Sequence, residues 1–399
     1  MTETNLILFD YNREDLKPLS FTRPVSDIRL GIITIKEKWE QMMETKGSYH
    51  CTDYLATKYP IKFSEKNILI NSTILPTPEL SNYIKNSLPA NTLLAKNGVP
   101  IALKTNTEIG SKFLSGNISA PETIECELDF TQISYPWDIF SFNGIALKTD
   151  FDLLTKNRTS KVLSSTNTII GDISQIFVEE GAWVECATLN TTKGPIYIGK
   201  NATIMEGCHI RGGFALCEGA TVKMGAKIYG PTTVGPFSKV GGELNNCVIL
   251  GYSNKGHDGF LGNSVIGEWC NLGADTNNSN LKNNYSEVRQ WNYKHKSFIP
   301  TGLQFCGLIM GDHSKAGINT MFNTGTVVGV SSNIYGGDFP RTFVPSFAWG
   351  SSKGFKNYNL EKSIGTAKTV YQRRNKKFDA TDERILKHIF EETSIFRKY

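Results

Sequence analysis

Eight aliphatic residues recur at every sixth position between residues 198 and 240, and this repeat constrains the fold more than any other feature. A spacing of six fits neither the 3.6-residue period of an α-helix nor the two-residue alternation of a flat strand. It suits a triangular solenoid in which each hexad supplies one short strand and one corner, and three hexads complete a coil. The eight residues, whose side chains we expect inside the prism, are Ile198, Ile204, Ile210, Leu216, Val222, Ile228, Val234 and Val240.

The repeat continues beyond residue 240 with two interruptions. After a two-residue slip it passes through Val248, Phe260, Ile266 and Leu272, and Asn254 is the only position of that phase without an apolar side chain. The stretch 277–303 is rich in Asn, Lys and Tyr and is too long for a corner, so we expect it to loop out. The pattern then resumes at Met310, Ala316, Phe322, Val328 and Ile334.

The regions on either side of the repeat have a different pattern. Apolar runs at residues 6–9 and 68–70 predict buried strands, and apolar residues at helical spacing in 31–43 predict a helix between them. Alternating strands and helices indicate an α/β layer domain. We therefore predict an α/β domain over residues 1–155, a linker over 156–175, a solenoid over 176–350 and a C-terminal helical arm over 351–399 that packs on the solenoid.

Composition and charge exclude several classes of protein. The net charge of +5 is too small and too evenly spread for a nucleic-acid binder. The eight cysteines form no C-x-x-C pair, which argues against a zinc ribbon or a thioredoxin motif. No apolar run approaches the length of a membrane span, and the first residues do not resemble a secretory signal. We expect a cytoplasmic protein that binds neither nucleic acid nor membrane.

Residues 251–280 carry the most specific motif. The stretch contains Lys255-Gly256-His257, Leu261-Gly262, Asn271-Leu272-Gly273-Ala274 and Thr276. It resembles the acetyltransferase half of the bifunctional uridyltransferase/acetyltransferase family GlmU, which has Lys-Ala-Gly-His, Tyr-Leu-Gly and Asn-Ile-Gly-Ala-Gly-Thr in this order. Phe260 stands where that family has tyrosine, and Asp275 where it has glycine.

This resemblance extends from about Val178 to about Trp349 and implies a left-handed parallel β-helix of hexapeptide repeats that assembles as a homotrimer. It implies that His257 is the general base of acetyl transfer from acetyl-CoA, and that Asn280 contacts the substrate and the oxyanion. Histidine suits the first role because its pKa lies near neutrality. A donor at the thioester oxygen suits the second, because negative charge develops there.

Four cations follow the first predicted strand: Arg13, Lys17, Arg23 and Arg29. A strand-to-helix crossing brings backbone N–H groups together, and cations nearby suit a triphosphate. This segment, with Tyr135–Phe140 and Asn143-Gly144, resembles the shortened nucleotidyltransferase domain of a Bacteroidetes-type GlmU-like family, which implies UTP and Mg²⁺ as substrate and cofactor. The usual Gly-x-Gly-Thr-Arg-Met loop is absent. In the alternative interpretation the arginines pair with Asp10, Glu14 and Asp27 in a scaffold.

Arg373 and Arg374 lie between two predicted C-terminal helices, where they would hold the phosphates of acetyl-CoA or simply be solvated. The sequence thus predicts a bifunctional enzyme that acetylates a hexosamine 1-phosphate and joins the product to UTP, giving UDP-N-acetylglucosamine. Two alternatives stay open: an enzyme with only its nucleotidyltransferase half active, and a non-catalytic solenoid that binds sugar nucleotides.

Overall fold

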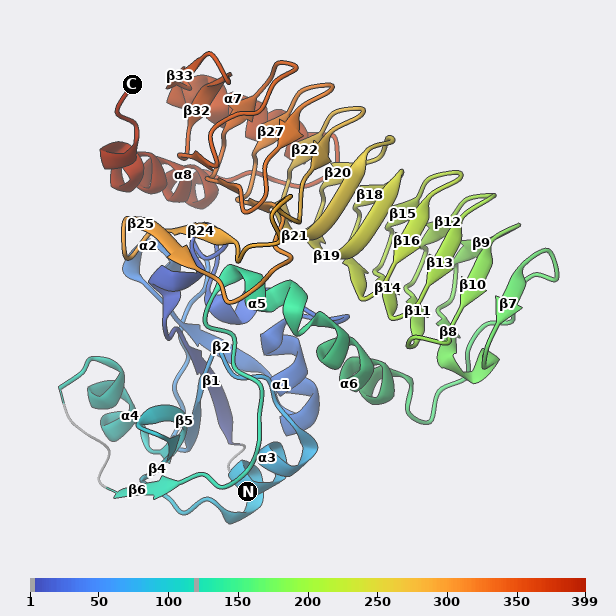
Figure 1. The fold of residues 1–399 in the computed structure, drawn as a ribbon. Helices are drawn as coiled ribbons and strands as arrows, with labels where there is room; N and C mark the ends of the chain where they lie inside the picture. Colours follow the sequence, from blue (N-terminus) through green and yellow to red (C-terminus); the bar gives the residue numbers. More distant parts are fainter. Residues whose placement is uncertain (1–3, 118–121) are drawn as a thin grey trace. The chain divides into compact units, whose positions relative to one another are not determined.

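The computed structural model describes residues 4–117 and 122–399 (Figure 1). By packing, the chain separates into two compact units. The first comprises residues up to Leu16, Thr22–Ile28 and Ile33–Ser134, and the second comprises Lys17–Phe21, Arg29–Ile32 and Tyr135–Tyr399. Two short pieces of the N-terminal region thus belong to the second unit. The four-part division expected from the sequence stays a prediction.

The first unit is an α/β domain built on one six-stranded sheet of order β2-β1-β3-β5-β4-β6. Strand β1 is central and pairs in parallel with both β2 and β3, whereas β5 runs antiparallel to β3 and β4. The strands are β1 Asn5–Phe9, β2 Gly47–His50, β3 Asn67–Asn71, β4 Thr92–Lys96, β5 Val99–Thr105 and β6 Glu122–Glu125. The helices are α1 Ile35–Met43, α2 Asp53–Ala56, α3 Pro78–Asn82 and α4 Thr107–Leu114. The two predicted strands and the first helix are confirmed.

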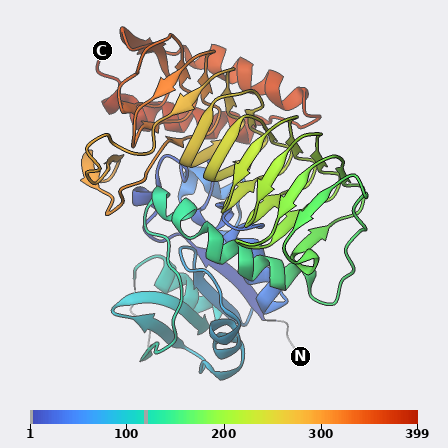
Figure 2. The ribbon, with the colours of Figure 1, turned by 45° about the vertical axis from the view of Figure 1, so that its right-hand side comes forward.

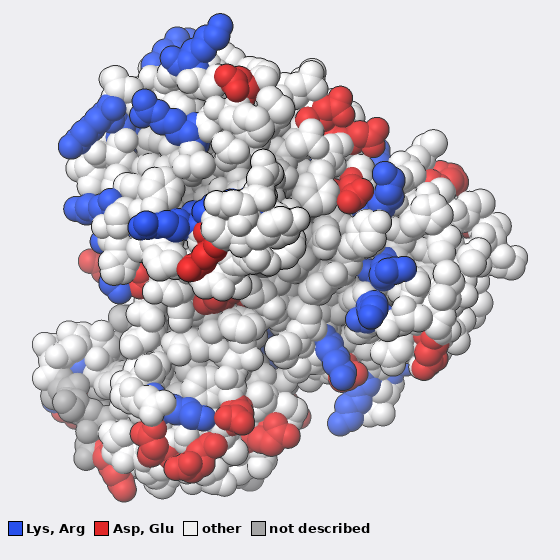
Figure 3. All heavy atoms as spheres, viewed as in Figure 1, with Lys and Arg blue, Asp and Glu red and all other residues white. Residues whose placement is uncertain are grey.

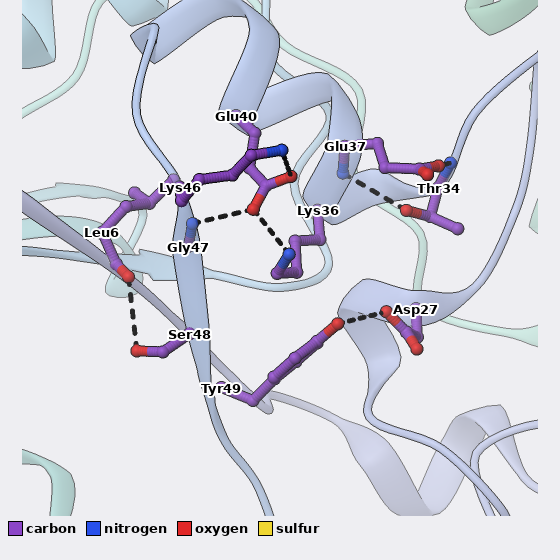
Figure 4. A network of polar contacts seen from close by, with 10 residues as sticks. All are labelled: Leu6, Asp27, Thr34, Lys36, Glu37, Glu40, Lys46, Gly47, Ser48 and Tyr49. Carbon is purple, nitrogen blue, oxygen red and sulfur yellow. Dashed lines mark hydrogen bonds and ion pairs between the residues drawn. The ribbon is translucent and has the colours of Figure 1, made fainter. Parts of the chain in front are cut away.

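Helix α1 is fixed at its start by a capping box and along its length by polar contacts (Figure 4). The Thr34 hydroxyl accepts a hydrogen bond from the Glu37 amide at 3.2 Å, and the Glu37 carboxylate accepts one from the Thr34 amide at 2.7 Å. The Glu40 carboxylate accepts from Lys36 Nζ at 2.5 Å and from the Gly47 amide at 2.8 Å, which ties the helix to the beginning of β2.

The second unit is a parallel β-solenoid with helices along it. Its coils follow one another from β7 to β32 in Figure 1, and the strands of successive coils lie side by side in Figure 2. Two large sheets of thirteen and ten strands run along the solenoid. The larger sheet includes strands of two faces, because the long strands β19 and β21 each continue round a bend from one face to the next. The predicted solenoid and α/β layers are confirmed.

The first half of the solenoid, before residue 240, contains strands β7 Thr168–Ile170, β8 Ile176–Val178, β9 Trp183–Val184, β10 Thr188–Asn190, β11 Ile196–Ile198, β12 Thr203–Ile204, β13 His209–Arg211, β14 Phe214–Leu216, β15 Thr221–Val222, β16 Lys227–Tyr229, β17 Thr232–Val234 and β18 Lys239–Val240. All eight residues of the hexad repeat are buried in one core cluster. Ile204 pairs with Val222 and Val222 with Val240, eighteen residues apart, so three hexads form one coil as predicted.

The second half contains β19 Glu243–Gly251, β20 Asn254–Lys255, β21 Phe260–Glu268, β22 Asn271–Leu272, β23 Asn277–Asn278, β26 Ile309–Met310, β27 Lys315–Ala316, β28 Met321–Phe322, β29 Val327–Val328, β30 Asn333–Ile334, β31 Phe343–Val344, β32 Ala348–Ser351 and β33 Gly354–Asn357. The predicted excursion leaves the solenoid as an antiparallel hairpin of β24 Arg289–Asn292 and β25 Ser297–Pro300.

The predicted phase after residue 240 is wrong by one position at three points, residues 248, 254 and 260. Val234 pairs with Ile249 and Leu244 with Leu261, and these residues belong to the core cluster, whereas Val248 and Phe260 do not. The cause is a shortened corner: only Gly241 and Gly242 separate β18 from β19, whereas four residues separate β20 from β21. As a result Lys255, and not Asn254, takes the inward position that Val240 has one coil earlier.

Helices cover parts of the solenoid. Helices α5 Pro136–Ser141 and α6 Asn143–Thr155 pack against β17, β19 and β21. The C-terminal arm contains α7 Leu360–Gln372 and α8 Ala380–Glu392. Tyr371 stacks on Trp269 with ring centroids 4.0 Å apart, and Phe390 packs edge-on against Phe347 at 5.1 Å, so the arm packs on the solenoid as expected. None of the helices within residues 4–117 and 122–399 is long and apolar enough to cross a membrane.

Candidate functional site

His257 lies at the corner between β20 and β21, and its side chain is exposed. The shortened corner of the preceding coil packs directly against this one. A Cβ atom on Gly242, whose φ is +73°, would lie 2.9 Å from the Asp258 Cα atom and 2.7 Å from the Gly259 oxygen. Glycine at this position therefore allows the two backbones to approach each other closely. The His257 corner is two residues longer than the corner beside it.

Lys255 holds this corner from within. Its side chain is 2% exposed, and its ammonium donates hydrogen bonds to the carbonyl oxygens of His257 at 2.5 Å and Asp258 at 2.9 Å. Burial lowers the pKa of Lys255 to about 8, and the nearby carboxylates of Asp258 and Asp275 only partly oppose this. The backbone of residues 257 and 258 is therefore anchored while the imidazole faces solvent.

Asn280 belongs to a ladder of asparagines seventeen residues apart. Its Nδ2 atom donates to Asn263 Oδ1 at 2.8 Å. Asn263 Nδ2 in turn donates to the Asn246 amide oxygen at 3.1 Å. In this orientation of the Asn246 side chain, the Asn246 amide nitrogen donates to the carbonyl oxygens of Pro231 and Phe140. An amide nitrogen carries two N–H donors, and Asn280 uses one of its two on Asn263. The predicted role of Asn280 at the oxyanion stays a prediction.

The asparagine ladder passes close to the His257 corner. A Cβ atom on Gly262 would lie 2.7 Å from Asn280 Nδ2 and 2.5 Å from the Phe260 ring, so both side chains lie over Gly262. Phe260 begins the strand that directly follows the His257 corner. The structure thus brings the asparagine amide and the ring that replaces the family's tyrosine to one position.

A group of cations lies on the coil face next to Lys255. Arg374 donates to Asn254 Oδ1 at 3.1 Å, and Asn254 is the neighbour of Lys255 in β20. The pKa of Lys239 is lowered by burial and by repulsion from Arg374, Lys223 and Arg373. Mutual repulsion within this group means that a bound anion would be stabilised there.

The ends of α7 and α8 extend this cationic region. A pocket is lined by Lys368, Gln372, Asn375, Lys376, Lys377 and Phe378. Lys376 lies over the stacked rings of Phe237 and Tyr252, with its Nζ atom 6.0 and 5.7 Å from their centroids. In the view of Figure 3, Lys and Arg side chains gather over the C-terminal elements. Arg373 and Arg374 are therefore part of a larger basic surface than the sequence predicted.

In the first unit, Arg13 follows the carboxyl end of β1, where the strand order reverses between β2 and β3. Such switch points in parallel sheets commonly bind ligands. Arg13 donates to the Tyr54 hydroxyl at 2.6 Å, and its Nε atom lies 3.4 Å from the Asp10 carboxylate. Burial raises the pKa of Asp10 to about 6, against the opposing effect of Arg13 and a hydrogen bond from the Val25 amide. Arg13 also lies 3.8 Å from Glu14, so the acidic partners expected in the scaffold interpretation are present.

The other three predicted cations have separate environments. Arg23 is buried in the first unit at 5% exposure. Lys17 belongs to the second unit, where its buried ammonium forms an ion pair with Glu392 and lies over the Phe21 ring. Arg29 also belongs to the second unit and donates to the Ile32 carbonyl.

Asn143, part of the second predicted nucleotidyltransferase motif, fixes the segment that contains Arg29. Its buried Oδ1 atom accepts hydrogen bonds from the Gly31 amide at 2.6 Å and from the Thr233 hydroxyl at 3.1 Å. The third acid of the scaffold interpretation, Asp27, accepts from the Tyr49 hydroxyl at 2.8 Å (Figure 4). This contact and burial raise the Tyr49 pKa.

The residues present do not by themselves form a magnesium site. Across the described ranges, no three His, Cys, Asp or Glu side chains are grouped so that they could hold a metal ion. Asp10, the buried carboxylate after β1, is already engaged by Arg13 and by the Val25 amide. The described residues thus offer no such cluster for the expected Mg²⁺, which stays a prediction.

Comparison with known proteins finds similarity to transferases. Residues 6–159 match the model of the family described as sugar nucleotidyl transferase. The bifunctional sugar-1-phosphate nucleotidylyltransferase/acetyltransferase of Sulfurisphaera tokodaii is 30% identical over 147 residues, which cover 36% of each chain. The bifunctional protein GlmU of Methanococcus vannielii is 28% identical over 213 residues, 53% of this chain and 44% of that one. The chain is thus similar to sugar nucleotidyl transferases in its first part and to GlmU-type bifunctional proteins over part of its length.

The chain spans less than half the length of the curated relatives it matches, 36% of the Sulfurisphaera protein and 27% of GlmU from Paracoccus denitrificans. Among solved structures, the polySia-specific acetyltransferase NeuO is matched over 49% of this chain and 86% of its own, with 16% identity and a TM-score of 0.27.

Proposed function

We propose that the chain catalyses two steps of sugar-nucleotide synthesis. The solenoid would transfer an acetyl group from acetyl-CoA to the amino group of a hexosamine 1-phosphate. The first unit would join the product to UTP, releasing pyrophosphate and giving UDP-N-acetylglucosamine. The main support is His257, an exposed imidazole on an anchored corner, within the stretch whose residues match the acetyltransferase motif of the family.

The acetyl-transfer step assigns the chemistry as follows. The amine attacks the thioester carbonyl, and the carbonyl oxygen becomes an oxyanion to which the Asn280 amide would donate. His257 takes the proton that the attacking nitrogen loses, and the C–S bond breaks as CoA leaves. The cations Arg373, Arg374, Lys239 and Lys223 would hold the phosphates of the donor.

The uridylyl-transfer step needs little covalent help. A phosphate oxygen of the sugar phosphate attacks the α-phosphorus of UTP, and pyrophosphate leaves. Positioning and positive charge stabilise such a reaction. Arg13, which follows β1, and Arg23, elsewhere in the first unit, would supply that charge.

One assay separates this proposal from the alternatives. Purified protein is incubated with glucosamine 1-phosphate, acetyl-CoA, UTP and Mg²⁺, and the products are identified by mass. The proposal predicts N-acetylglucosamine 1-phosphate, CoA, pyrophosphate and UDP-N-acetylglucosamine. If UDP-N-acetylglucosamine forms only when N-acetylglucosamine 1-phosphate is supplied, the chain is a nucleotidyltransferase alone. If no product forms, the chain is a binding scaffold.

We further propose that the enzyme works as a homotrimer in the cytoplasm. Closed cyclic symmetry is the usual form of homo-oligomers, and the three faces of a prism suit threefold packing. Light scattering should give about 133 kDa, three times the chain mass of 44.3 kDa. A mass equal to that of one chain would contradict the trimer.

Removing the two arginines of the basic surface should weaken donor binding. We expect Arg373→Ala/Arg374→Ala to raise the KM for acetyl-CoA about tenfold, because a charge-assisted hydrogen bond contributes about 1.5–3 kcal/mol. The kcat should change little, because neither residue is assigned to the reacting atoms. Lys387→Ala is the matched control, since Lys387 is paired with Glu383 on α8 at 2.8 Å. Equal KM values for the double variant and the control would exclude the phosphate role.

A further inference from the structure

Lys255 occupies a position at which packing alone would not place a lysine. It shares its register with Val240, and its side chain is 2% exposed within the solenoid. The flanking inward residues Val240 and Leu272 are aliphatic members of the core cluster. Burial of an ammonium group costs free energy unless its N–H donors and its charge are compensated. A methionine of similar length would fill the same space without that cost.

The compensation for this charge comes from the corner that carries His257. Two N–H donors of Lys255 reach the carbonyl oxygens of His257 and Asp258. The equivalent corners in other coils are closed by the backbone instead: the Ala226 amide donates to the Lys223 carbonyl at 3.3 Å, and the Thr276 amide to the Gly273 carbonyl at 3.2 Å. At the His257 corner, the Lys255 ammonium therefore supplies the stabilising hydrogen bonds that the backbone supplies at these other corners.

The neighbouring coils hold the rest of this corner. The Asp258 oxygen also accepts from the Asp275 amide at 3.0 Å, which links the corner to the following coil. The closest approach on the other side is that of Gly242. Neither contact involves the carbonyl of His257 itself. Within the described residues, that carbonyl accepts its hydrogen bond from Lys255.

We propose that Lys255 is a positioning residue for acetyl transfer: from inside the solenoid it fixes the backbone of His257 and Asp258 and so directs the His257 imidazole toward the substrates. This inference rests on the proposed role of His257 as the base. It also implies that the chain carries a buried charge at the expense of stability, as functional sites commonly do. Removing the charge should then impair the reaction without unfolding the protein.

The test compares Lys255→Met with Lys315→Met. Lys315 is the control, because it also donates to a histidine carbonyl, that of His313 at 3.1 Å, but it does so from a half-buried position next to the inward Ala316, where it lines a small cavity with residues of α7. Three quantities are measured for each variant: kcat for CoA release with glucosamine 1-phosphate as acceptor, KM for acetyl-CoA, and hydrogen exchange of the amides of residues 256–259. Thermal unfolding is recorded in parallel.

For Lys255→Met we expect a kcat about 10- to 100-fold lower and an unchanged KM. Amide exchange at residues 256–259 should be at least about tenfold faster, because this corner has lost the ammonium that donates to it. The unfolding midpoint should not fall, because an apolar residue replaces a desolvated charge. Lys315→Met should change neither kcat nor amide exchange at residues 256–259. Wild-type kcat and wild-type exchange in Lys255→Met would overturn the inference, as would a loss of kcat that only follows a lower unfolding midpoint.

The exchange measurement separates this inference from the proposed function. If the wild-type protein releases no CoA, the proposed acetyl transfer fails and Lys255 has no reaction to support. If the wild type is active, and Lys255→Met is equally active although its amides at residues 256–259 exchange faster, acetyl transfer stands and the positioning role fails.

Discussion

Replacing His257 by alanine should lower kcat for CoA release by a factor of about 10² to 10⁴, the usual contribution of a positioned general base. The KM for acetyl-CoA should change little, because the substitution alters none of the cations assigned to the donor phosphates. The fold should persist, since His257 is exposed and contributes its backbone carbonyl, which alanine retains, to the bond with Lys255. The initial rate of CoA release, measured at saturating substrates, checks this.

His209→Ala provides the control for His257→Ala, because His209 is also exposed on the solenoid, in β13, several coils away. It should keep the wild-type rate. Asn280→Ala should cost a factor comparable to that of His257→Ala, and the two losses should be less than additive if both act on one transition state. A folded His257→Ala protein that acetylates at the wild-type rate would remove the catalytic assignment and favour a nucleotidyltransferase alone or a scaffold.

The solenoid could be predicted from sequence because its inward positions accept almost only apolar side chains and the coils between residues 198 and 240 have the same length. Ile204, Val222 and Val240 recur at eighteen residues for this reason. The six-residue spacing of inward residues breaks after Val240, because the corner there is shorter. Adjacent apolar residues at 248–249 and 260–261 then fitted the repeat equally well, and only the pairing of strands distinguishes them.

A candidate site could be proposed from the sequence where its residues are close together, and not where distant segments meet. The motif around His257 lies on one corner, so its spacing could be recognised. Lys17, by contrast, pairs with Glu392, which lies 375 residues away and leaves no trace in the neighbouring sequence. The ladder of Asn246, Asn263 and Asn280 has a seventeen-residue spacing that could have been noticed, but its meaning depends on knowing the length of those coils.

Arginine substitutions after β1 should impair uridylyl transfer selectively. We expect Arg13→Ala to lower kcat/KM for UTP about 10- to 100-fold, because its guanidinium is held in place by Asp10 and Tyr54 before substrate binds and a charged hydrogen bond to phosphate contributes about 1.5–3 kcal/mol. Arg23→Ala should raise the KM for UTP or abolish pyrophosphate release. Pyrophosphate release from UTP and N-acetylglucosamine 1-phosphate measures both effects, and CoA release from acetyl-CoA should be unchanged.

Two further variants determine how Arg13 acts. Tyr54→Phe removes one hydrogen-bond partner of the guanidinium while keeping its charge, so its loss of kcat/KM should be smaller than that of Arg13→Ala. Arg158→Ala removes an arginine whose partner is Glu179 in the solenoid unit, and it should have no effect on pyrophosphate release. If Arg13→Ala and Arg23→Ala both keep the wild-type rate, these arginines belong to a scaffold. If both lose uridylyl and acetyl transfer equally, they maintain the fold, because a nucleotide contact in the first unit has no part in the chemistry at His257.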